Sequence, residues 1–175
     1  MPHDPHPHAI RRLLSGGQTG VDRAALDAAI ALGIPHGGWC PAGRLAEDGR
    51  IPARYRLQET DSPAYALRTQ RNVLDSDGTL ILSHGPLSGG TELTRRLAQH
   101  YEKPCLVVDL LQPPPHATVL AWLDAHRVRD LNVAGPREST RPGIAEVAER
   151  YLRQLLTAIT RGGRTPRLDG GPGLR

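Results

Sequence analysis

The chain has 175 residues, a length that suits one domain with room for a sheet covered by helices on both faces. Its 38% hydrophobic and 23% charged residues are normal for a globular protein, and no apolar run is long enough to cross a membrane. The net charge of +4 comes largely from arginines near the end of the chain, and aromatic residues are scarce. The composition therefore does not favour nucleic acid as a partner, because it indicates neither a basic surface nor a set of aromatic stacking platforms.

The two ends differ in composition from the middle of the chain. Residues 1–9 carry three prolines and three histidines and are expected to form a flexible arm. Residues 10–160 are expected to form a single domain, and residues 161–175 a loose, basic tail rich in glycine and proline. Because we find no secretory signal, no membrane segment and no disulfide framework, we expect a cytoplasmic protein.

Apolar periodicity predicts short strands that alternate with helices. Strands are expected at residues 10–14, 35–40, 79–83, 104–109 and 131–134. Helices are expected at residues 21–32, 64–75, 92–101, 117–125 and 142–160. Residues 41–51 read as a loop, and residues 55–59 are ambiguous. This alternation is typical of an α/β protein with a Rossmann-like, open parallel sheet of about five or more strands and helices on both faces.

Three loops each follow a predicted strand and precede a predicted helix. They are residues 15–20, 83–91 and 132–139, which we call the first, second and third loops. In an open parallel sheet such loops gather at the carboxyl edge, where ligands bind. Their convergence is a stronger argument than any one of the three motifs.

The first loop, SGGQTG, can bring backbone N–H groups close to an anion at a helix N-terminus. It lacks the lysine of a P-loop and is not a strict GxGxxG motif. We predict that Gly17→Asp abolishes anion binding and leaves the fold intact. The predicted contacts here are Gly16, Gly17, Gln18, Thr19 and Gly20.

The second and third loops add hydroxyl, amide and charged groups. Arg137 suits a bidentate clamp on phosphate or carboxylate, although a surface ion pair is an equally good interpretation. Glu92 lies in the first turn of a predicted helix, where a carboxylate commonly complements the helix dipole. The predicted contacts are Ser88, Gly89, Gly90 and Thr91 in the second loop, and Asn132, Gly135, Arg137, Glu138 and Ser139 in the third.

Other polar residues are weaker candidates for the walls of the site. They are Asp22, Arg23, Trp39, Arg44, Arg71 and Asn72. We find no nucleophile elbow, no HExxH motif and no EF-hand spacing, so the sequence indicates no metal ligands and no catalytic constellation.

Four stretches, in this order and spacing, resemble the molybdenum carrier family of the SLOG branch of Rossmann-like proteins. They are SGGQTGVDRAALDAA, GWCPAGRLAEDGRIP, LSGGTELT and LNVAGPRES, within residues 13–156. The resemblance implies a homo-oligomer, a dimer or tetramer, that binds the molybdenum cofactor, a phosphorylated pterin. It also implies a role in storing, protecting or delivering that cofactor to molybdoenzymes, or receiving it from cofactor-biosynthesis proteins. Ala42 stands where such proteins often carry a basic residue.

Two other functions use the same loops. One is a nucleotide-binding sensor. The other is an N-glycosidase acting on nucleoside monophosphates, as in the related Lonely Guy enzymes, so enzymatic activity stays open. The glycosidase signature PGGxGTxxE places its glutamate three residues after the threonine, where this chain has Thr94. Glu92 and Arg96 are the only catalytic candidates under that hypothesis.

Overall fold

The computed structural model describes residues 9–162 of the chain. Five parallel strands form the central sheet, in the order β2-β1-β9-β7-β8. They are β1 (Arg12–Leu14), β2 (His36–Gly37), β7 (Gly78–Ser83), β8 (Cys105–Asp109) and β9 (Asp130–Ala134). The predicted parallel sheet and Rossmann-like fold class are therefore confirmed. The expected arm, apart from Ala9, lies outside the described residues.

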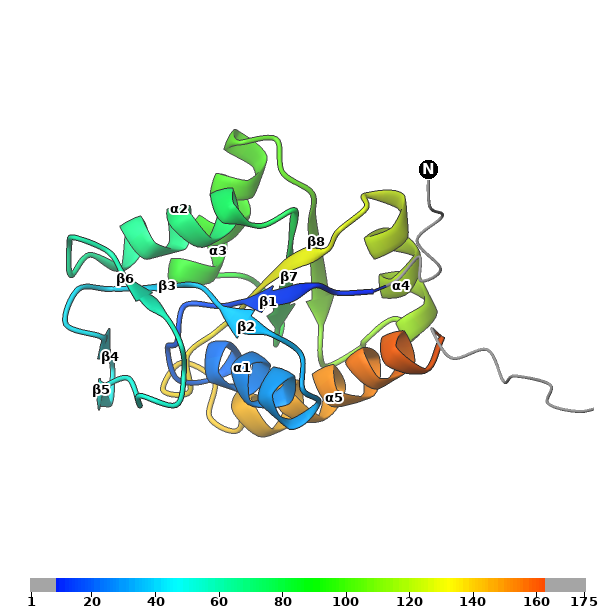
Figure 1. The fold of residues 1–175 in the computed structure, drawn as a ribbon, viewed down its shortest axis with the longest axis horizontal. Coiled ribbons are helices and arrows are strands. Elements are labelled where there is room, and N and C mark those ends of the chain that lie inside the picture. Colours follow the sequence, from blue (N-terminus) through cyan, green and yellow to red (C-terminus); the bar gives the residue numbers. More distant parts are fainter. Residues whose placement is uncertain (1–8, 163–175) are drawn as a thin grey trace, which may run out of the picture.

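Helices cover both faces of this sheet (Figure 1). They are α1 (Val21–Ala31), α2 (Tyr65–Asp75), α3 (Gly89–His100), α4 (His116–Ala125) and α5 (Ile144–Gly162). α1 packs against α5 on one face, and α2 packs against α3 on the other. None of the helices in the described part of the chain is long and apolar enough to span a membrane.

The residues explain which elements are most deeply buried. All six residues of β7 are buried, as expected for a central strand of a parallel sheet covered on both faces. α1 faces the core with alanines, whose small side chains let it approach closely. α5 contributes an apolar stripe that includes Ile144, Leu152 and Leu156.

Two small sheets lie between β2 and α2, where the sequence analysis was least accurate. The strand expected at residues 35–40 is divided at Gly38 into β2 and β3 (Trp39–Cys40), and β3 pairs in parallel with β6 (Gln58–Glu59). The loop expected at residues 41–51 contains an antiparallel hairpin of β4 (Leu45–Ala46) and β5 (Gly49–Arg50). Strands of two residues carry too little periodicity for a sequence to reveal them.

The helix ends also differ from the prediction. α3 begins three residues earlier than expected, at Gly89, so two glycines of the second loop belong to its first turn. α5 continues to Gly162, so residues 161 and 162 of the expected tail belong to this helix. The remaining residues of the expected tail, from 163 onward, lie outside the described part of the chain.

Candidate functional site

A cavity of about 390 Å³ opens at the carboxyl edge of the central sheet. The first, second and third loops line it together with one face of α2. Its volume falls in the range of about 300–1,000 Å³ that is typical of small-molecule sites. The three loops therefore converge as the parallel topology predicts.

Most of the predicted contact residues line this cavity. They are Gly16, Gln18, Ser88, Gly89, Gly90, Thr91, Asn132, Gly135, Arg137 and Ser139. Gly17, Thr19, Gly20 and Glu138 are not among the lining residues. Sequence analysis placed these four residues in the correct loops, but in the structure they contact other parts of the protein and do not border the cavity.

The prediction that Gly17→Asp leaves the fold intact is wrong. Gly17 has a φ of +78°, and a Cβ there would lie 2.6 Å from Leu57 Cδ1 and 3.0 Å from Ile51 Cδ1. The left-handed backbone and the contacts with buried Ile51 and partly buried Leu57 both resist a side chain. Gly17→Asp would therefore damage the fold and could not report on anion binding alone.

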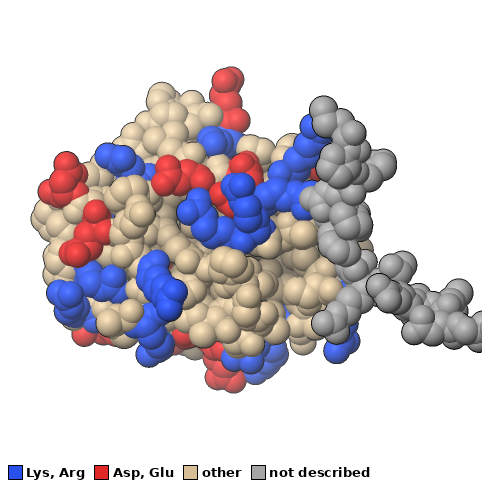
Figure 2. Space-filling view, in the orientation of Figure 1, with Lys and Arg blue, Asp and Glu red and all other residues tan. Residues whose placement is uncertain are grey.

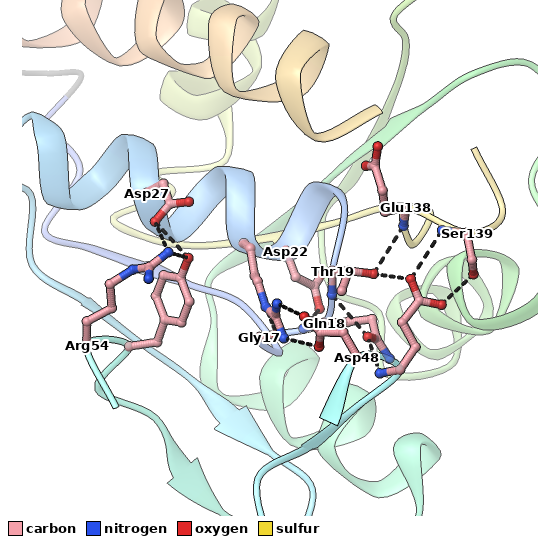
Figure 3. Close-up of polar contacts among 12 residues, drawn as sticks. Gly17, Gln18, Thr19, Asp22, Asp27, Asp48, Arg54, Glu138 and Ser139 are labelled. Carbon is pink, nitrogen blue, oxygen red and sulfur yellow. Dashed lines mark hydrogen bonds and ion pairs between the residues drawn. The ribbon is translucent and has the colours of Figure 1, made fainter. Parts of the chain in front are cut away.

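Gly20, Thr19 and Glu138 connect the first loop to the third. A Cβ at Gly20 would overlap the carbonyl oxygen of Pro136, so the two loop backbones touch there. The amide of Glu138 donates to Thr19 Oγ1 at 3.2 Å, a contact visible in Figure 3. The Glu138 carboxylate accepts from the amides of Gly143 and Ala145 and so caps the start of α5. These residues hold the loops together behind the cavity wall.

Arg68 and Asp22 form a buried ion pair on the wall. Arg68 Nη1 lies 2.8 Å from Asp22 Oδ2, and the two side chains are only 12% and 7% exposed. The same carboxylate oxygen accepts from the amide of Gln18. A Cβ at Gly16 would overlap Arg68 Nη1, so glycine is required for the guanidinium to lie over the first loop. Arg68 Nε is buried and has no hydrogen-bond partner among the described residues.

Gln18 presents a second buried donor of the same kind. Its Oε1 accepts from the amides of Thr19 at 3.0 Å and Glu47 at 2.9 Å, which fixes the orientation of the side-chain amide. Within the described part of the chain, Gln18 Nε2 is left buried without an acceptor. Gln18 and Arg68 both line the cavity, so two side chains that each carry a buried donor without an acceptor form part of its wall.

The second loop supplies the N-terminus of α3. Ser88 is its N-cap residue, and Gly89 and Gly90 occupy the first turn, where amide groups have no acceptor within the helix. Ser88, Gly89 and Gly90 all line the cavity, so the positive end of the helix dipole borders it. This end of the helix favours an anionic ligand group.

Glu92 and Arg96 are not among the residues that line the cavity. Glu92 is instead paired with Arg95 at 2.7 Å and with Arg96 at 3.2 Å. Hydrogen bonds from Arg95, and then from Arg96, lower the pKa of Glu92 to about 2. A carboxylate with so low a pKa is a poor proton donor near neutral pH. Thr94, at the position of the glycosidase glutamate, does line the cavity and donates to the carbonyl oxygen of Gly90.

Helix α2 contributes residues that the sequence analysis largely missed. Tyr65, Arg68, Thr69 and Asn72 follow helical spacing and line the cavity from one face. The sequence signal that could have found them is the polar face of this predicted helix, which lies beside the sheet edge. Arg137 also lines the cavity, with its guanidinium 5.5 Å from the centre of the Tyr65 ring.

The weaker candidates have mainly internal partners. Asn72 exchanges hydrogen bonds with the backbone of Trp39, and Trp39 Nε1 donates to Asp75. Arg44 donates to the carbonyl oxygens of residues 51, 52 and 55. Arg23 pairs with Asp48. Trp39, Arg44, Arg71 and Ala42 do not line the cavity.

Charge is mixed on the molecular surface and positive in the cavity. On the face in Figure 2, acidic side chains interrupt the basic ones, so this face has no unbroken basic surface. Two guanidiniums, of Arg68 and Arg137, line the cavity against the one carboxylate of Asp22. Among the described residues, no group of three or more His, Cys, Asp or Glu side chains could hold a metal ion.

A parallel sheet whose loops enclose a cavity at the carboxyl edge defines a Rossmann-like ligand-binding domain. A model of the circularly permutated YpsA SLOG family matches residues 13–156, and the chain belongs to that family. A crystal structure of a putative molybdenum carrier protein from Syntrophus aciditrophicus SB is 49% identical, with a TM-score of 0.80. The match covers 86% of this chain and 95% of that one, and the predicted resemblance is confirmed. No curated protein matches the chain.

Proposed function

We propose that this protein binds the molybdenum cofactor as cargo, and stores, protects or delivers it. The observation that carries the proposal is the pair of buried donors without acceptors, Gln18 Nε2 and Arg68 Nε, on the cavity wall. A buried donor costs about 1–3 kcal/mol until an acceptor meets it, so the cavity favours an acceptor-rich ligand. The name of the solved relative supports a molybdenum-containing ligand.

The chemistry of the lining residues fits this cargo. The cofactor is a pterin with a phosphate and a dithiolene-bound molybdenum, and it brings its own metal ligands. The α3 N-terminus and Arg137 suit the phosphate, whereas Gln18 and Arg68 offer donors to the acceptors of the pterin or the phosphate. We further propose that the protein is cytoplasmic, forms a homo-oligomer and passes the cofactor to molybdoenzymes.

The N-glycosidase hypothesis has less support from the site. Glu92, its candidate catalytic glutamate, is held by two arginines outside the cavity lining. A nucleotide would still find the same anion-favouring groups, so nucleotides belong in the test as competing ligands.

The proposal is tested by calorimetric titration without oxygen, using molybdenum cofactor released from a molybdoenzyme. Molybdate, AMP and inorganic phosphate are titrated in parallel. We expect the cofactor to bind at least about 100-fold more tightly than the other three, because it offers both a phosphate for the anion-favouring groups and further acceptors for the Gln18 and Arg68 side chains. Gln18→Glu should weaken cofactor binding by about 10-fold or more, because it replaces a donor with a negative charge.

The matched control is Gln99→Glu, on the surface of α3, which adds the same charge outside the cavity lining. It should bind the cofactor like the unaltered protein. Equal affinity for the cofactor and AMP would contradict the proposal. Release of free adenine from AMP would instead establish an enzyme.

A further inference from the structure

The hairpin of β4 and β5 reaches the glycine-rich first loop through two adjacent acidic residues. Asp48 pairs with Arg23 at 2.5 Å, and Arg23 Nε also donates to the carbonyl oxygen of Gly17. The backbone amide of Glu47 donates a hydrogen bond to Gln18 Oε1, whereas its carboxylate has other partners. The hairpin was expected to be a plain loop, and neither residue was a predicted site residue.

The Glu47 carboxylate connects the first loop to the third. Oε1 accepts a hydrogen bond from the Thr19 hydroxyl and one from the Ser139 amide, the latter at 3.2 Å. Oε2 accepts from the Ser139 hydroxyl and lies 3.9 Å from Arg137 Nη1. In Figure 3 the dashed lines from Thr19 and from Ser139 meet at one carboxylate. One side chain therefore holds residues from two of the three loops.

The electrostatics of Glu47 agree with this arrangement. Desolvation, the largest single contribution, raises the pKa of Glu47, but the hydrogen bonds from Ser139 and Thr19 together lower it below its ordinary value. The ionised form is therefore the one that the two loops stabilise. Its side chain is 18% exposed, so the carboxylate is largely enclosed by its donors.

Glu47 is not among the residues that line the cavity. Ser139 and Arg137 line the cavity, whereas Thr19 and Glu47 do not. Glu47 therefore does not occupy the volume that a ligand would take. Its contacts instead act on two residues that a ligand would meet.

We infer that Glu47 is a positioning residue of the binding site, which clamps the first loop to the third and holds Ser139 and Arg137 against the cavity. Its effect on ligand affinity rests on the proposed function. The same residue fixes Gln18 through its backbone amide, so the hairpin sets two walls of the site. Substitutions of its side chain should act on affinity without any direct ligand contact.

The first experiment needs no ligand. Amide hydrogen exchange of the unliganded protein is measured by NMR in Glu47→Ala and Thr19→Val, with Asp48→Ala as the matched control on the same hairpin turn. Loss of the clamp should speed exchange at Ser139 in Glu47→Ala and at Glu138 in Thr19→Val by about 10-fold. Asp48→Ala removes the neighbouring ion pair and should leave both amides protected. Unchanged protection of Ser139 in Glu47→Ala would overturn the inference.

The second experiment measures affinity for the molybdenum cofactor in the same variants. Glu47→Ala and Thr19→Val should each bind about 5-fold or more weakly, and Asp48→Ala within about 2-fold of the unaltered protein. Tighter or equal binding by Glu47→Ala would overturn the positioning role while leaving the proposed function in place. If the unaltered protein binds no cofactor, the proposed function fails and the exchange measurement alone decides whether Glu47 clamps the loops.

Discussion

Arg68 in α2 and Asp22 in α1 form an ion pair of 2.8 Å that crosses the first loop above Gly16. The two helices lie on opposite faces of the central sheet, and the pair joins them at its carboxyl edge. Because both side chains are largely buried, either charge left alone would be costly. The pair is therefore both a structural link and part of the cavity wall.

Arg68→Met should destabilise the protein by about 3–5 kcal/mol, because the Asp22 carboxylate stays buried without its partner. Adding Asp22→Asn should recover much of that stability, since a neutral amide is cheaper to bury. Cofactor binding should stay weak in both variants, because both lack the Arg68 donor. Chemical denaturation measures stability, and calorimetry measures binding. A double variant that regains binding together with stability would contradict a role for Arg68 in the site.

Gly16→Ala should displace the Arg68 side chain, because the new methyl group would occupy the position of Nη1. The backbone is not the obstacle, since Gly16 is not among the positive-φ residues. We expect a loss of about 1–3 kcal/mol in stability and a marked loss of binding. In an Arg68→Met background the same alanine should cost much less, and a double-mutant cycle measures that coupling. Independent, additive costs would show that the two residues do not contact each other.

Asp130 should make stability depend on pH. Hydrogen bonds from Arg11 lower its pKa, with a contribution from Arg12, and its side chain is 6% exposed. Because the folded pKa lies below the unfolded value of about 3.9, the stabilisation is complete above that value and is lost as pH falls through the folded pKa. Asp130→Asn should lower the free energy of unfolding by about 1–3 kcal/mol at pH 7.

The difference between the unaltered protein and Asp130→Asn should then shrink as the pH falls below about 4. Glu146→Gln is the control, because its ion pair with Arg150 is 81% exposed at the carboxylate and should contribute less than about 0.5 kcal/mol. Denaturation curves at pH 7 and pH 3 give both differences. A constant difference across this range would contradict the assignment.

Glu92→Gln should leave cofactor affinity within about 2-fold of the unaltered protein, because the residue does not line the cavity. Thr94→Val is the informative comparison, since Thr94 lines the cavity at the position of the glycosidase glutamate. Calorimetry measures affinity, and chromatography of incubated AMP detects free adenine. Adenine release that disappears in Glu92→Gln would show that the residue is catalytic.

The sequence was sufficient for the fold class and the convergence of the three loops, because strand alternation and parallel topology fix which ends meet. It could not show that Thr19 and Glu138 face one another rather than a ligand, since both possibilities need the same residue types. Arg68 was missed because its partner Asp22 is far away in sequence, and Glu47 because a hairpin of two-residue strands leaves no pattern. Long-range side-chain pairing, rather than local propensity, decides these cases.

β9 lies in the middle of the central sheet, although it is the last of the sheet's strands in the chain. Before it is in place, β1 can pair only with β2, and β7 only with β8, so the sheet consists of two separate halves. During synthesis the ribosome must release residues up to about the third loop before these halves can join. Assembly of the sheet and closure of the ligand cavity are therefore one late event, and a chain cut short before β9 would have neither.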